Sequence, residues 1–321
     1  WSNSRRSTFK SCKRKYYFQY YGFWDGWEDD APERTRTIYR LKKLNSRHTW
    51  KGTIIHEAIA FLLKSLLNDK DIDIEEFKKV VIGKMRDQYR TSLSGDYKTD
   101  PKNNFGLLEH YYDEEVEKET WQLLKESVIR SLDNFRGSKF QSLSQEDCLS
   151  LEGDLKGSEN IWKNLSPNLN TWKNLPSGPA ADNFTVDGVK VWVKIDFAYR
   201  KQDSSISLID WKSGNSEEEP DPTQLNIYGY YASEVWGVPE EKIYLTAYNV
   251  NQDEQYDRTF SKEGKQETRE KILSSVENMK EMLVNREENE AQEDYFSKVE
   301  NDNFCRHCRY WQVCKPELVN S

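Results

Sequence analysis

The chain of 321 residues contains no apolar run close to the roughly 20 residues that a membrane span needs. No secretory hydrophobic segment stands at its start either, so we expect a soluble, cytoplasmic protein without membrane contact. It has 5 cysteines, and an odd count without a signal peptide argues against a secreted disulfide scaffold. Because the chain begins at Trp1 and not at Met, we expect the natural N-terminus to lie upstream.

Acidic residues are missing from the first 24 positions, although the formal charge of the whole chain is -8. That segment carries the basic residues Arg5, Arg6, Lys10, Lys13, Arg14 and Lys15. The acids gather elsewhere, for example at 113–119 and 287–293. A basic surface can therefore coexist with an acidic total. A solvated helix face would give the same pattern.

Hydrophobic periodicity predicts a mixed α/β layout. The expected helices are 8–24, 52–67, 74–90, 109–135, 224–236 and 262–286. The expected strands are 184–186, 189–199, 206–211, 242–250 and a partner near 256–260, with a tight turn at Asp187-Gly188. Segment 34–51 is expected to be a connector, and 154–182 is loop-like. The core would comprise 1–60 and 184–321, interrupted by a mainly helical insertion at 61–183.

The strand that ends in Asp210-Trp211-Lys212 carries the main chemical signal. Residues i and i+2 of a strand point to one face, so Asp210 and Lys212 project together. If the preceding strand pairs with it, Asp196 faces Asp210. Two carboxylates bind a hard cation such as Mg²⁺ or Mn²⁺, and a lysine beside them can orient water and offset phosphate charge. D-x-K triplets are often exposed charges, but the apolar neighbours of this one indicate a buried strand, where charges need partners.

Three further side chains could join this site. His56 lies on the apolar side of a predicted helix, where a histidine is more often packed than a ligand. Gln224 and Tyr228 are spaced i, i+4 and share a helix face just after the Asp/Lys strand. Alone, each would be ordinary helix surface.

Four of the cysteines form a second candidate site. Cys305, Cys308 and Cys314 stand close together in the tail, and Cys12 lies in the basic N-terminal segment. Thiolates favour zinc or iron–sulfur clusters. His307 is an alternative zinc ligand, whereas Cys148 matches no pattern.

Taken together, the pieces resemble the RecB-like branch of the PD-(D/E)XK nuclease superfamily. They are GxxxH at 52–56, Asp196, DxK at 210–212 and QxxxY at 224–228. The resemblance implies a restriction-endonuclease-like core, a central mixed sheet flanked by helices. It implies a metal held by His56, Asp196, Asp210 and the backbone carbonyl of Trp211. Asp196, Asp210 and Lys212 would be the catalytic residues, and Gln224 and Tyr228 would position Lys212 or contact the DNA backbone.

The cysteine order, one near the start and three in CRHCRYWQVC, resembles the iron–sulfur nucleases of the CRISPR-associated RecB-like and AddB types. This resemblance implies a 4Fe–4S cluster on Cys12, Cys305, Cys308 and Cys314 that joins the two ends of the chain. The helicase part of the recombination enzymes is absent, since no G-x-x-x-x-G-K-S/T loop occurs.

The expected function is hydrolysis of phosphodiester bonds in DNA, with single strands or free ends as substrates. The pathway could be repair, recombination, CRISPR adaptation or defence. Two alternatives are a catalytically silent scaffold with the same fold and a zinc-binding interaction module. A protein partner could dock on the insertion.

Overall fold

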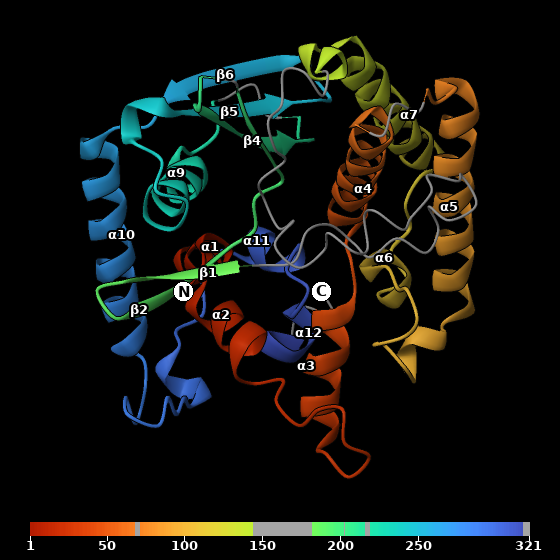
Figure 1. The fold of residues 1–321 in the computed structure, drawn as a ribbon. Coiled ribbons are helices and arrows are strands. Elements are labelled where there is room, and N and C mark those ends of the chain that lie inside the picture. Colours follow the sequence, from red (N-terminus) through yellow and green to blue (C-terminus); the bar gives the residue numbers. More distant parts are fainter. Residues whose placement is uncertain (68–70, 144–181, 202, 216–218, 317–321) are drawn as a thin grey trace. The chain divides into compact units, whose positions relative to one another are not determined.

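The computed structural model of the protein describes residues 1–67, 71–143, 182–201, 203–215 and 219–316 (Figure 1). The chain divides into two compact units. The first, here called the cysteine unit, comprises residues 1–47, 88–114 and 271–321. The second, here called the sheet unit, comprises residues 48–87 and 115–270. Helices α5 (Ile74–Ser94) and α10 (Lys262–Lys280) contribute residues to both.

A four-stranded mixed sheet forms the centre of the sheet unit. Its strands lie in the order β3 (Phe197–Arg200), β4 (Ile206–Lys212), β5 (Ile243–Asn249) and β6 (Glu254–Thr259). Only β4 and β5 pair in parallel. A parallel pair needs a crossover, and here α9 (Thr223–Val235) lies within the connection. The prediction of a mixed α/β fold is therefore confirmed.

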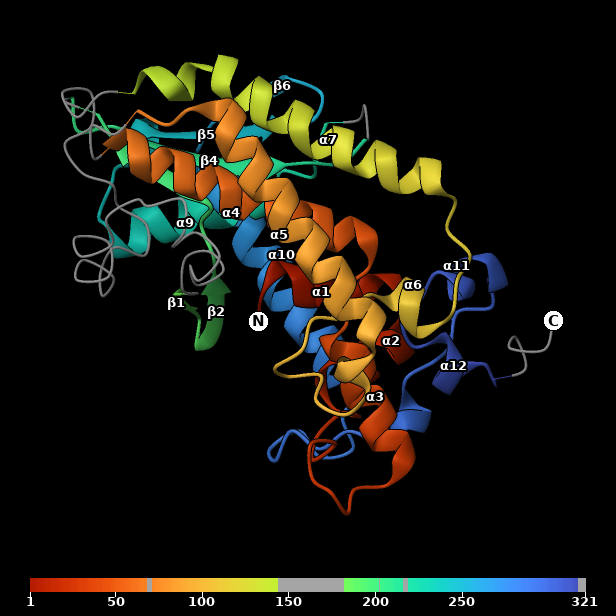
Figure 2. The same ribbon diagram turned by 90° about the vertical axis from the view of Figure 1, so that its right-hand side faces the viewer.

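Helices cover both faces of this sheet (Figure 2). Successive side chains of β4 point to opposite faces. Asp210 meets Tyr228 of α9, whereas the Trp211 ring packs edge-on against Phe135 of α7 (Lys118–Gly137) at a centroid distance of 5.7 Å. Helix α9 and helix α7 therefore lie on opposite faces, and the acid of β4 faces α9.

Three long helices pack together in the sheet unit, as Figure 2 shows for α4 (Arg47–Leu67), the first half of α5, and α7. Phe61 and Phe77 stack at 5.0 Å between α4 and α5. Lys84 pairs with Glu57 of α4 at 2.6 Å, and Lys78 pairs with an aspartate of α7. These contacts fix the helix that carries His56.

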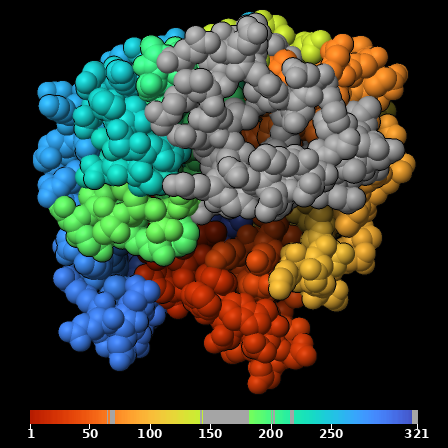
Figure 3. All heavy atoms as spheres, in the orientation of Figure 1, coloured from red at the N-terminus to blue at the C-terminus, as the bar shows by residue number. Residues whose placement is uncertain are grey.

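A separate hairpin of β1 (Asp182–Val186) and β2 (Val189–Val193) lies against α9. Asp187 and Gly188 have φ angles of 46° and 81°, which a type I′ turn requires. Phe184 packs edge-on against Tyr230 of α9 at 5.3 Å. The hairpin (green) and α9 (cyan) form a continuous surface in Figure 3. The predicted turn is confirmed.

Short helices surround the core of the cysteine unit. They are α1 (Asn3–Ser11), α2 (Lys13–Tyr20), α3 (Glu33–Lys43), α6 (Leu108–Tyr111), α11 (Asp302–Arg306) and α12 (Trp311–Cys314). Phe18 of α2, Leu41 of α3 and Tyr310 next to α12 are fully buried in one cluster. Segments from the two ends of the sequence therefore share one hydrophobic core.

The single helix predicted for 8–24 is wrong. Cys12 adopts an extended backbone with φ of −166°, which ends α1 and begins α2. Its Sγ accepts a hydrogen bond from the backbone N of Lys15 at 3.4 Å, so the thiol caps α2. Helical spacing continues across this break, which explains why the sequence pattern does not show it.

Other predicted boundaries also need correction. The connector predicted at 34–51 contains α3 and the start of α4, and α10 ends at Lys280, short of the predicted 286. The helix predicted for 109–135 is interrupted between α6 and α7.

The strand predicted for 189–199 is broken at 194–196, because its first half pairs in the hairpin and its second half in the main sheet. Most of the predicted loop at 154–182 lies outside the described residues, and the division at 61–183 stays a prediction. No helix within the described ranges has the length and apolar character to cross a membrane.

Candidate active site and cysteine pocket

Asp210 and Lys212 project from the end of β4, as the alternation of the strand predicts. The Asp210 side chain is only 6% exposed, and Nζ of Lys212 lies 2.5 Å from its Oδ2. Burial, followed by the nearby charge of Asp196, raises the pKa of Asp210 above its usual value, although Lys212 opposes the shift. The strand end thus holds an acid that a cation would stabilise as carboxylate.

Asp196 stands beside this pair because of the register of β3. Phe197 pairs with Ile209, so the residue before β3 lies level with Asp210. Its Oδ2 accepts a hydrogen bond from the backbone N of Trp211 at 3.0 Å. The conditional prediction that Asp196 faces Asp210 therefore agrees with the antiparallel pairing of β3 and β4.

His56 of α4 reaches the same carboxylates. Its Nδ1 lies 3.5 Å from Oδ1 of Asp196. Burial lowers the pKa of His56, but Asp196 and Asp210 outweigh this effect and leave the pKa above its ordinary value. Gly52 of α4 lies near the residue that follows β4, since a Cβ at that position would stand 3.4 Å from Oγ of Ser213, an ordinary van der Waals contact.

Tyr228 is buried beneath the site. Its hydroxyl donates to the backbone carbonyl of Lys194 at 2.6 Å and lies 3.3 Å from Oδ1 of Asp210. Gln224 hydrogen-bonds the same hydroxyl. In this arrangement Tyr228 and Gln224 hold Asp210 and the irregular segment 194–196 between β2 and β3 in place. The carbonyl of Lys194 has no sequence signature, and sequence analysis missed it for that reason.

The residues at this site fit a divalent cation chemically, although they are not arranged as a coordination sphere. In the part of the chain that the structure describes, no three His, Cys, Asp or Glu side chains form a metal-binding group. Oδ2 of Asp210 is buried and is paired with Nζ of Lys212 at 2.5 Å, and His56 also offsets the charge of this carboxylate. Two adjacent carboxylates at a buried strand end are features that a hard cation would neutralise.

Comparison with protein-family models gives one match, to the PD-(D/E)XK nuclease superfamily, over residues 1–315. The chain belongs to this superfamily. The match covers nearly the whole sequence, so both units lie within it. No curated protein matches the chain significantly.

Membership in the PD-(D/E)XK superfamily supports a nuclease, and therefore a hydrolase that acts on nucleic acid. Such nucleases typically use Mg²⁺ or Mn²⁺. The mixed sheet with helices on both faces is consistent with a restriction-endonuclease-like fold.

The four cysteines singled out in the sequence line one cavity in the cysteine unit. Cys12, Cys305, Cys308 and Cys314 are free of disulfides. The cavity measures about 20 Å³, room for roughly one water-sized group. Among the described residues these thiols are not arranged as a metal-binding group, so any metal centre here would require the cysteine side chains to reorient.

The electrostatics of this cavity suit thiolate ligands only when a cation is present. Burial raises the pKa of Cys314 to about 11, with Cys12 and Cys308 adding to the shift and Lys298 opposing it. Burial also raises the pKa of Cys308, and the neighbouring cysteines add to it. The thiols of Cys308 and Cys314 therefore resist deprotonation, and a bound metal would reverse this preference.

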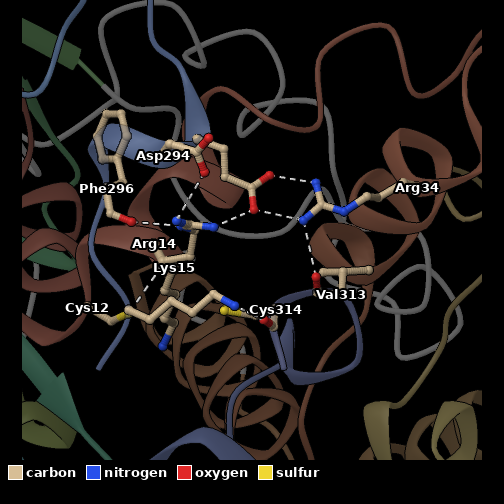
Figure 4. Close-up of polar contacts among 10 residues, drawn as sticks. Cys12, Arg14, Lys15, Arg34, Asp294, Phe296, Val313 and Cys314 are labelled. Carbon is tan, nitrogen blue, oxygen red and sulfur yellow. Dashed lines mark hydrogen bonds and ion pairs between the residues drawn. The ribbon is translucent and has the colours of Figure 1, made fainter. Parts of the chain in front are cut away.

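An arginine–glutamate network fastens the segments that carry these cysteines (Figure 4). Arg14 donates to the carbonyl of Phe296 at 2.7 Å and pairs with Oε1 of Glu293 at 2.5 Å. Arg34 pairs with the same carboxylate at 2.6 Å and donates to the carbonyl of Val313 at 3.2 Å. The helix after Cys12 and the short helix that ends at Cys314 are thus tied to one half-buried acid.

Proposed function

We propose that the chain is a metal-dependent deoxyribonuclease that hydrolyses phosphodiester bonds at the end of β4. The observation that carries the proposal is the convergence of four groups there. Asp210 and Lys212 share one strand face, Asp196 lies level with them, and His56 contacts Asp196. Family membership supports a nuclease, and this geometry supports the choice of these residues.

The proposed ligands of the catalytic cation are His56, Asp196, Asp210 and the carbonyl of Trp211. When bound, Mg²⁺ or Mn²⁺ would polarise a phosphate oxygen and lower the pKa of a water molecule. The ammonium group of Lys212 pairs with Asp210, which keeps it at the site. Its side chain is 37% exposed, so a water molecule can reach the ammonium group. Its ammonium group would orient the attacking water and offset the charge that develops on phosphate.

The remaining residues act indirectly. Tyr228 restrains Asp210 and the Lys194 carbonyl, and Gln224 restrains the hydroxyl of Tyr228. Since the Tyr228 side chain is buried, we propose a positioning role for it rather than a contact with DNA. The proposed substrates are single-stranded DNA and DNA with free ends.

A cleavage assay tests the proposal. End-labelled single-stranded and double-stranded DNA would be incubated with Mg²⁺ or Mn²⁺ and with wild type, Lys212→Ala or Lys118→Ala. Lys118 is an exposed lysine of α7 and controls for the loss of one positive charge. We expect cleavage by wild type and Lys118→Ala, and at least a roughly 100-fold loss in Lys212→Ala. Equal cleavage by all three proteins would refute the assigned site, and no cleavage by wild type would favour a silent scaffold.

For the cysteine pocket we propose a metal centre on Cys12, Cys305, Cys308 and Cys314. The sequence resemblance supports a 4Fe–4S cluster, and zinc is the alternative, since thiolates favour both. Iron, sulfide and zinc analysis of anaerobically purified protein, with its visible absorbance, distinguishes the two. Cys308→Ser should lower the bound metal in either case, and unchanged content would remove Cys308 from the ligand set.

A further inference from the structure

A basic groove runs along the cysteine unit beside the cysteine pocket, with which it shares Cys12, Lys298 and Val299. It has a volume of about 460 Å³. Its walls come from α1 and the start of α2, from residues 271–278 of α10, and from the segment 297–299. Figure 2 shows α1 beside α10.

Hydrogen bonds hold these walls in place. The indole nitrogen of Trp1 donates to Oγ of Ser275 at 3.0 Å, which joins the chain start to α10. The backbone N of Arg14 donates to the carbonyl of Ser297 at 3.1 Å, which joins α2 to the third wall. The groove is therefore built from three fixed segments that are remote in sequence.

The charge of the groove differs from that of the chain. Its basic lining residues are Arg6, Lys10, Lys13, Lys271 and Lys298. No acid is among the described residues that line it. In the whole sequence acidic residues outnumber basic residues, 55 to 47. The groove lining is therefore more positive than the chain as a whole. A concave wall of one charge sign raises the local concentration of oppositely charged ligands.

The other lining groups suit phosphate as well. Hydroxyl and amide side chains complete the walls, namely Ser11, Ser274, Ser275, Ser297 and Asn278. Lysine, serine and asparagine are common partners of backbone phosphates in nucleic-acid complexes. Phe9 contributes an apolar element to the wall, with Nζ of Lys13 5.8 Å from its ring centroid, but the ring is only 9% exposed and packs edge-on against Tyr16. The groove therefore offers contacts to phosphates rather than a stacking platform for bases.

We propose that this groove binds the sugar–phosphate backbone of single-stranded nucleic acid. Lys10 and Lys13 contact the phosphates, and Ser274, Ser297 and Asn278 donate to phosphate oxygens. Lys298 adds positive charge from the groove wall, where its Nζ donates to the carbonyl of Cys314 at 2.6 Å. A flexible single strand can follow a concavity between helices, whereas a stiff duplex presents its phosphates on a convex surface. The inference rests on the proposed nuclease function and extends it by a substrate-binding site in the cysteine unit. Cys12 lines both the groove and the cysteine pocket, so a bound strand passes next to the cysteines.

The test compares two double variants of equal charge. Lys10→Gln with Lys13→Gln removes two groove charges. Lys98→Gln with Lys102→Gln removes two exposed charges of the same unit that do not line the groove. Binding of fluorescent oligodeoxythymidylate is measured by anisotropy in EDTA at several salt concentrations. Each lost phosphate contact lowers the slope of log K against log salt by about 0.7 for single strands.

We expect the groove variant to bind more weakly, with a slope reduced by about 1.4, and the control to match wild type. The affinity lost between about 50 and 200 mM salt should then shrink by roughly sevenfold. Lys10→Arg with Lys13→Arg should restore binding, which shows that charge and not folding is responsible. Equal slopes for the two glutamine variants overturn the proposal. Full displacement of the oligonucleotide by inorganic pyrophosphate also overturns it, because the groove would then be a simple anion site.

The binding assay needs no cleavage, so it separates this inference from the proposed function. Asp210→Asn is expected to lose cleavage and keep binding. If the groove variant binds as well as wild type while Lys212→Ala loses cleavage, the groove inference fails and the nuclease stands. If wild type does not cleave DNA and the groove variant still shows the reduced slope, the proposed nuclease function fails and the groove inference stands.

Discussion

Substitution of Glu293 tests whether the network in Figure 4 stabilises the cysteine unit. The Glu293 carboxylate accepts from Arg14 at 2.5 Å and from Arg34 at 2.6 Å and 2.8 Å. The side chain of Arg14 is 9% exposed, that of Glu293 22%, and that of Arg34 49%. The change to be made is Glu293→Gln, which keeps the shape and removes the charge.

The expected loss in the free energy of unfolding comes mainly from Arg14. Removing one partner of a fully buried ion pair costs about 3–5 kcal/mol, because the other charge stays buried. Exposed pairs contribute about 0–1 kcal/mol, which is the range for Arg34. Glu293 is partly exposed and glutamine can still accept one hydrogen bond, so we expect a loss of about 2–3 kcal/mol. Asp294→Asn is the control, since Asp294 is fully exposed and lies 3.9 Å from Arg14, and we expect no measurable change.

The effect should depend on pH. Burial raises the pKa of Glu293, but the two arginines outweigh it and hold the pKa below its ordinary value. A lowered folded-state pKa gives stability that is present above the unfolded value, about 4.3, and is lost as the pH falls through the folded value. The difference between wild type and Glu293→Gln should therefore stay constant from pH 7 to about pH 5 and shrink in stronger acid.

Hydrogen exchange detected by mass spectrometry gives a local readout, which matters because two units need not unfold together. Exchange in α2 and in residues 293–316 should accelerate in Glu293→Gln at neutral pH, and not in Asp294→Asn. If the two variants exchange alike, or if the difference grows in acid, the reasoning about this buried pair is wrong.

Three further substitutions test the sheet unit, and chelation tests the cysteine pocket. Tyr228→Phe should lower kcat about 10-fold with an unchanged Kd for DNA, because the hydroxyl restrains Asp210 and is remote from solvent; an equal loss in binding would contradict a positioning role. Gly229→Ala should cost about 1–3 kcal/mol in urea unfolding, because its Cβ would lie 2.6 Å from the ring of Phe260. Gly83→Ala, with open space around its Cβ on α5, should instead stabilise by about 0.5–1 kcal/mol. Strong chelators should accelerate exchange in residues 293–316 and leave β4 protected, if the cysteines hold a metal.

Much of the candidate site was predictable from local sequence. The period of two along 206–212 places Asp210 and Lys212 on one face, and the structure has them there. The Asp187-Gly188 turn was predictable because few residue pairs adopt positive φ at both positions. The cysteine spacing in the tail likewise predicted that three thiols lie close together, and all three line one cavity with Cys12.

Helix ends were less predictable, because the signals that end a helix are weak compared with tertiary contacts. Cys12 breaks the helix predicted for 8–24 by adopting an extended backbone and capping α2 with its thiol. The interruption between α6 and α7 falls within a charged stretch whose helical pattern continues. Local propensity is a weak prior, and packing overrides it at such points.

The sequence by itself determined the alternation of side chains along β4, the placement of an acid and a lysine on one face of that strand, and the hairpin turn. These features depend on backbone geometry over a few residues. Only the tertiary structure decided that Asp196 lies level with Asp210, that Tyr228 donates to the carbonyl of Lys194, and that Glu293 joins two arginines. It also decided that residues 6–13 and 271–299 enclose one basic groove. Such contacts join residues far apart in the chain, often through backbone groups that every residue carries. No local sequence pattern therefore predicts them.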